Sequence, residues 1–126
     1  QLYMKLFLLI VLVFSVVILG FVLVGQSLIG MWLSQADAVQ KVNEYCSLLL
    51  IGTAFNALYN VGYIDWIVRK KAKNILALNL FSLALTMILL PISINTYGVK
   101  GAAFGWVFVN LTGFCVSLGW LRTKKL

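Results

Sequence analysis

Residues 6–24 have the sequence LFLLIVLVFSVVILGFVLV, an almost wholly apolar run without a charged side chain. A helix needs about 20 mostly apolar residues to cross the roughly 30 Å of hydrocarbon in a bilayer while it satisfies its own backbone hydrogen bonds. Three further runs of this kind follow, at about residues 46–66, 75–94 and 101–121. A signal peptide explains the first run poorly, because Lys5 is the only basic residue before it and no small-residue cleavage site follows.

The composition agrees with a membrane protein. Of the 126 residues, 63% are hydrophobic and only 10% are charged, and the mean hydropathy is +1.03. One soluble core of this size could not bury so much apolar surface. The predicted fold class is therefore all-α, an integral membrane bundle of four transmembrane helices in which residues 1–126 form a single membrane region.

The basic residues predict the orientation of the bundle, because Lys and Arg are retained in short cytoplasmic segments during insertion. Only Lys41 and Lys100 lie on one side of the predicted spans. The other eight basic residues lie before the first span, in the short link after the second and in the tail: Lys5, Arg69, Lys70, Lys71, Lys73, Arg122, Lys124 and Lys125. We therefore expect cytoplasmic N- and C-termini, and we attribute the net charge of +7 to topology rather than to nucleic-acid binding.

No catalytic constellation can be assembled from the sequence. The chain has no His, three acidic residues and no Gly-rich phosphate loop, and the spacing of Cys46 and Cys115 does not suggest a metal site. We predict that the protein is not an enzyme and holds no metal or cofactor, apart from a coupling H+ or Na+ if it transports.

Polar residues inside the spans follow helical spacing. Three spans each carry one polar or small face, formed by Thr53, Asn56, Asn60 and Tyr63, by Asn79, Ser82 and Thr86, and by Asn110, Gly113 and Ser117. Such residues commonly join membrane helices by hydrogen bonds or close packing. Alternatively, they line a hydrophilic translocation path, for which Asn56 and Asn60 are the best candidates, followed by Asn79 and Asn110.

Small residues and one acid have simpler predicted roles. Gly101, Gly105 and Gly113 are candidate helix-packing positions, and the first two have GxxxG spacing. Asp65 is close enough in sequence to be the interfacial partner of Arg69. Pro91 predicts either a kink or the approach of the end of the 75–94 span.

One stretch resembles a known family. Residues 91–103, PISINTYGVKGAA, have a span end, a Tyr-Gly turn and a Gly-Ala-Ala start of the next span. This pattern resembles a recurrent hairpin of the multidrug/oligosaccharidyl-lipid/polysaccharide exporter superfamily, and within it most resembles the polysaccharide transporters, the O-antigen (Wzx-type) flippases. The outer GMWL at residues 30–33, the pair Phe55-Asn56 and the basic RKKAK at residues 69–73 fit the same likeness.

The resemblance implies a larger transporter of about a dozen helices in two lobes, of which this chain would supply part of the C-terminal lobe. Gln1 in place of an initiating Met suggests the same. The implied function is the flipping of undecaprenyl-pyrophosphate-linked oligosaccharide units across the bacterial inner membrane for O-antigen or capsule biosynthesis, driven by a proton or sodium gradient. The implied partners are this lipid-linked oligosaccharide, the bilayer and the remainder of the transporter chain.

Two alternatives stay open at this point. A drug/cation antiporter of the same superfamily (MATE-type) should carry intramembrane acids, and the sequence offers only Asp65 at an edge. A complete small four-span protein, either GtrA-like or a helper of another membrane subunit, fits the length and the topology.

Overall fold

Four helices make up the structure. The computed structural model describes residues 2–118 and contains α1 (Leu2–Gly30), α2 (Ala36–Val68), α3 (Ala72–Tyr97) and α4 (Val99–Ser117). Each helix is long and apolar enough to cross a membrane. The predicted all-α fold of four membrane helices is confirmed, and the chain is a multi-pass membrane protein. Residues 119–121 of the fourth predicted span and the basic residues of the tail lie outside the described part.

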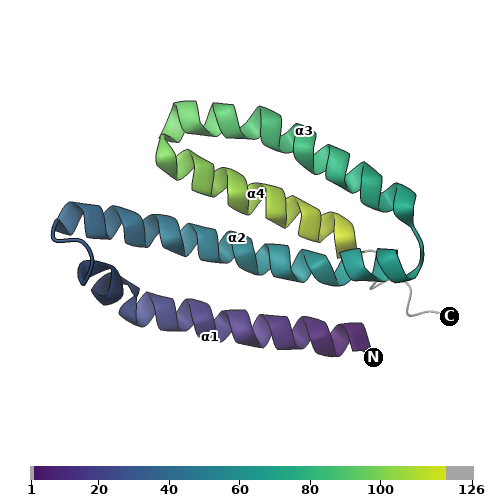
Figure 1. The fold of residues 1–126 in the computed structure, drawn as a ribbon, viewed down its shortest axis with the longest axis horizontal. Helices are drawn as coiled ribbons and strands as arrows, with labels where there is room; N and C mark the ends of the chain where they lie inside the picture. The colour runs from purple at the N-terminus through teal and green to yellow at the C-terminus, as the bar shows by residue number, and fades with distance from the viewer. Residues whose placement is uncertain (1, 119–126) are drawn as a thin grey trace.

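The helices lie side by side in a flat bundle, in the spatial order α1, α2, α4, α3 (Figure 1). α2 therefore packs between α1 and α4, and α3 reaches α2 only slightly because α4 separates them. The start of α1, the link between α2 and α3 and the end of α4 lie at one end of the bundle, which we call the basic end (Figure 1). The α1–α2 and α3–α4 turns lie at the opposite end.

The first two helices extend beyond the predicted apolar runs. α1 continues to Gly30, and α2 begins at Ala36, so only residues 31–35 separate the two helices. Hydropathy marks the part of a helix that lies in hydrocarbon, whereas the polar residues 36–45 contain no Gly or Pro to stop the helix. At 33 residues, α2 is about 50 Å long and reaches past the apolar core at one or both ends.

The α3–α4 hairpin is made by a single residue, Gly98, between the two helices. Its backbone angles, φ 63° and ψ −142°, belong to a region that glycine alone populates readily. Its N–H donates to the carbonyl of Ile94 at 2.8 Å, and one turn later Gly101 packs directly on the backbone carbonyl of Ser93. Pro91 lies inside α3, which continues to Tyr97, so the proline does not end the helix.

Small residues also let α2 approach α4. Gly52 lies under the Trp106 indole, and Gly62 faces the backbone and side chain of Ser117. Gly113 lies against the Tyr59 ring, so that a Cβ added at Gly113 would be 3.6 Å from the nearest ring carbon. We call these three paired contacts the α2–α4 seam. Van der Waals packing of this kind is the main attraction between helices in lipid, where the hydrophobic effect no longer favours association.

Aromatic rings extend the seam toward α1. Phe114 of α4 lies 5.9 Å from Phe55 of α2 and 6.4 Å from Phe7 of α1, measured between ring centroids. Gly25 of α1 is also buried, beside Phe21 of its own helix and Asn43 of α2. α1 thus packs against α2, and Phe7 adds an aromatic contact to Phe114 of α4.

The seam makes a prediction about stability. In Gly62→Ala, the new Cβ would overlap the Ser117 carbonyl, so backbone must shift, and we expect a loss of about 1–3 kcal/mol. Gly20→Ala is the matched control, because a Cβ there meets nothing within 4 Å and alanine favours the helix. Thermal unfolding in detergent should show a lower midpoint for Gly62→Ala only; equal midpoints would mean that α2 and α4 pack less closely.

Candidate functional site

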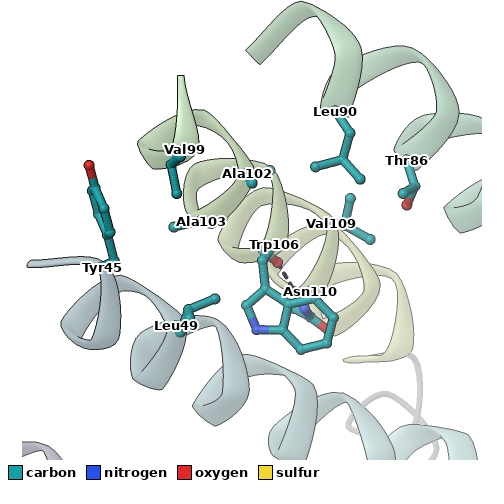
Figure 2. A pocket seen from close by; sticks show the side chains of 11 residues that line it. Tyr45, Leu49, Thr86, Leu90, Val99, Ala102, Ala103, Trp106, Val109 and Asn110 are labelled. Atoms are coloured by element: carbon teal, nitrogen blue, oxygen red, sulfur yellow. Dashed lines mark hydrogen bonds between the residues drawn. The ribbon is translucent and has the colours of Figure 1, made fainter. Parts of the chain in front are cut away.

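Asn110 of α4 is the most deeply buried of the predicted path residues, with 8% of its surface exposed. Its Nδ2 donates to the backbone carbonyl of Trp106 at 2.8 Å, one turn earlier in the same helix (Figure 2). An amide has two N–H groups and a carbonyl oxygen, so this bond uses only part of its capacity. Asn110 also lines a cavity of about 500 Å³.

The cavity lies between α2, α3 and α4. Leu49 comes from α2, Thr86 and Leu90 from α3, and the Trp106 indole extends from α4 toward α2 (Figure 2). The remaining wall is formed by Tyr45, Val99, Ala102, Ala103, Gly105 and Val109. The cavity is therefore mainly apolar, and its polar lining residues are Asn110, Thr86, Tyr45 and, through its indole N–H, Trp106.

An ion pair crosses between helices near the Tyr45 side of the cavity. Lys100 of α4 pairs with Glu44 of α2, and its Nζ also lies 5.6 Å from the centroid of the Phe104 ring. Both charged side chains are partly exposed. Sequence reasoning did not predict this contact, which joins residues 56 positions apart.

The two predicted asparagines of α2 continue the face that lines the cavity. Leu49, Thr53, Asn56 and Asn60 follow steps of four, three and four residues, which places them on one side of the helix. Thr53 and Asn60 are exposed, and Asn56 is half-buried. Thr53 donates to the carbonyl of Leu49 at 2.7 Å, and Asn60 donates through Nδ2 to the carbonyl of Asn56 at 2.9 Å.

Asn79 of α3 lies on the same side of the bundle. It precedes the cavity-lining Thr86 by seven residues, two helical turns, and its side chain is exposed. Thr86 donates to the carbonyl of Ser82 at 2.7 Å. Asn110 lines the cavity itself, and helical spacing places Asn56, Asn60 and Asn79 on the same sides of α2 and α3 as the cavity-lining Leu49 and Thr86. We call the side that carries these four asparagines the asparagine face.

The hydrogen bonds bear on the two hypotheses for the polar stripes. Four of these polar side chains donate to a backbone carbonyl in their own helix: Asn60, Asn110, Thr53 and Thr86. Three glycines of α4 make close contacts with neighbouring helices: Gly101 meets Ser93, Gly105 meets Leu90 and Gly113 meets Tyr59. The side-chain hydrogen bonds of Asn60 and Asn110 are therefore local to their own helices.

Asp65 is the partner of Arg69, as predicted. Its Oδ1 accepts a hydrogen bond from Arg69 Nε at 2.9 Å, and its side chain is almost fully buried whereas that of Arg69 is 43% exposed. The other acids, Asp37 and Glu44, lie near the opposite end of α2. Over residues 2–118, no cluster of three or more His, Cys, Asp or Glu could hold a metal ion, and Cys46 and Cys115 are free thiols.

Fold and site together define a multi-pass membrane protein with one polar, asparagine-bearing face beside an apolar cavity. Comparison of the chain with models of known protein families, with characterised proteins and with solved structures finds no match.

The Asp65–Arg69 pair makes a second prediction about stability. Arg69→Ala leaves a buried carboxylate without this partner and should lower the unfolding free energy by about 1–3 kcal/mol, with the exposure of Arg69 favouring the lower end. Lys41→Ala, which removes an exposed basic side chain from the same helix, is the matched control and should leave the melting midpoint unchanged.

A double variant separates charge from packing. Asp65→Asn in the Arg69→Ala background removes the buried charge and should restore part of the lost stability. A midpoint that stays equally low in the double variant would contradict the electrostatic explanation.

Proposed function

We propose that the chain is part of a bacterial inner-membrane flippase of the polysaccharide transporter type, which moves undecaprenyl-pyrophosphate-linked oligosaccharide units for O-antigen or capsule biosynthesis. The observation that carries this proposal is the asparagine face, where Asn110 lines the cavity and helical spacing places Asn56, Asn60 and Asn79 on the cavity side of α2 and α3. The resemblance of residues 91–103 to the exporter hairpin supports it, and those residues form the hairpin around Gly98.

The chemistry of the face suits a neutral glycan. Amide groups donate to and accept from sugar hydroxyls without carrying a charge, and Asn56, Asn60 and Asn79 present such groups on exposed or half-buried surface. The adjoining apolar cavity provides a surface for the nonpolar parts of an amphipathic substrate. A proton or sodium gradient is the proposed energy source.

The four helices need further helices to make a path. A flat bundle leaves the asparagine face open, and alternating access requires a second repeat or lobe to close over such a site. The remainder of the transporter chain is the proposed partner. The basic residues of the described helices lie at or near helix ends, so we place the pyrophosphate site in that remainder.

The orientation follows from the same proposal. The start of α1 with Lys5 and the link with Arg69, Lys70 and Lys71 lie together at the basic end. By the positive-inside rule this end is the proposed cytoplasmic one, with the Gly98 turn on the outer side.

A drug/cation antiporter is less well supported, because Asp65, the acid within a predicted span, is buried and paired with Arg69. Cation binding there would have to displace an existing ion pair.

A flipping assay tests the proposal directly. The full-length protein is reconstituted into liposomes with a fluorescent lipid-linked oligosaccharide, and transfer between leaflets is followed by accessibility to a soluble glycosidase. Asn56→Ala with Asn60→Ala should slow flipping by more than about tenfold, since two amide contacts of about 1 kcal/mol each are lost.

The control is Asn95→Ala, which removes an exposed asparagine near the end of α3. It should leave the rate unchanged, and both proteins should melt alike because the Asn60 bond is local and exposed. Unaltered flipping in the double variant would remove the α2 stripe from the path. Flipping that is absent from the unmodified protein, with the variants equally inactive, would instead favour a small helper protein.

A further inference from the structure

A second cavity lies at the basic end, between α2, α3 and α4. It has a volume of about 370 Å³ and is lined by Trp66 of α2, by Asn74, Ala77, Leu78 and Phe81 of α3, and by Val116 of α4. Asn74 is the only amide among these side chains and Trp66 adds an indole N–H, so the cavity is a mainly apolar groove with an amide at the first turn of α3. We call it the basic-end groove.

The link from α2 to α3 connects two walls of this groove. The Lys71 N–H donates to the carbonyl of Trp66 at 2.9 Å, and the Asn74 N–H donates to the carbonyl of Lys71 at 3.1 Å. Lys71 therefore lies between a residue of the α2 wall and a residue of the α3 wall. Lys70, Lys71 and Lys73 are all exposed.

The charge at this end is almost entirely positive. The sequence contains three acids, of which Asp37 and Glu44 lie near the opposite end of α2. The third, Asp65, is nearly fully buried and is paired with Arg69. The three exposed lysines thus have no acidic side chain within the described helices to balance them.

We propose that the basic-end groove binds an anionic phospholipid, with an acyl chain in the groove and the phosphate at Lys70, Lys71 and Lys73. A basic surface at the end of an apolar cleft between membrane helices complements both parts of such a lipid. The Asn74 amide can donate to the phosphate or glycerol oxygens. Trp66 lies near the end of α2, and tryptophans near the ends of membrane helices commonly lie at the membrane interface. This site is independent of the proposed function.

Trp66 makes the site measurable. The full-length protein, with its other tryptophans changed to phenylalanine, is placed in nanodiscs that contain phosphatidylcholine and a small fraction of lipid with brominated acyl chains, which quench nearby indoles. Brominated phosphatidylglycerol should quench Trp66 with a relative affinity at least about fivefold above that of brominated phosphatidylcholine. Nanodiscs expose both membrane faces, so the result does not depend on how the protein was inserted.

Two variants separate the parts of the site. Lys70→Gln, Lys71→Gln and Lys73→Gln together should bring the affinity ratio close to one, whereas the control Lys41→Gln, at the opposite end of α2, should not change it. Ala77→Phe fills the groove without altering the charge and should reduce quenching by both lipids.

The proposal is overturned by an affinity ratio of one in the unmodified protein, by a ratio that survives loss of the three lysines, or by quenching that is insensitive to Ala77→Phe. Competition by millimolar inorganic phosphate would indicate a site for the free anion and would also overturn it. Native mass spectrometry on the protein with all tryptophans present should show retained phosphatidylglycerol, fewer copies of which remain after the triple lysine substitution.

Discussion

The close approach of α2 and α4 is the contact on which the rest of the structure depends. These two helices are not neighbours in sequence, and each brings one further helix to the bundle, α1 beside α2 and α3 beside α4. In lipid, apolar side chains gain little by leaving the surrounding acyl chains, so association relies on close packing. Gly52 and Gly62 on α2 and Gly113 on α4 provide it, because each meets a larger side chain or a backbone segment across the seam.

The seam also affects which side chains line the cavity and the asparagine face. The Trp106 indole fits over Gly52, and both Trp106 and Asn110 line the cavity of about 500 Å³. On α2 and α3, the polar residues lie on a different side of the helix from the residues that pack against α4. Asn60 and Asn79 therefore remain exposed. A polar surface inside a membrane is stable only where it meets protein or water. The asparagine face would thus need protein or water beside it, and this consideration underlies the proposal of a larger transporter.

Much of the fold could be predicted from the sequence because each helix is marked by its own apolar run. Helical spacing also grouped Asn56 with Asn60 on α2, and the i,i+4 spacing of Asp65 and Arg69 suggested their pairing, which is confirmed. Local periodicity describes one helix at a time. It contains no information on which helices touch, so neither the α1, α2, α4, α3 order nor the cavity beside Asn110 could be predicted.

The helix ends and the cross-helix contacts were missed for related reasons. An apolar run ends where charged and amide side chains begin. The helix α2 nevertheless includes such residues, because it starts at Ala36. The Glu44–Lys100 pair depends on α2 and α4 being adjacent, which only the seam establishes.

In the proposed transporter the asparagine face borders an aqueous path, and cysteine labelling tests this most directly. In full-length protein with Cys46→Ser and Cys115→Ser, single cysteines replace Asn60, Asn79, Leu12 or Met87, the last two being exposed apolar positions on α1 and α3. A water-soluble, membrane-impermeant maleimide should modify cysteines at 60 and 79 and spare those at 12 and 87. Equal protection at all four positions, or equal reaction at all four, would contradict an aqueous path along this face.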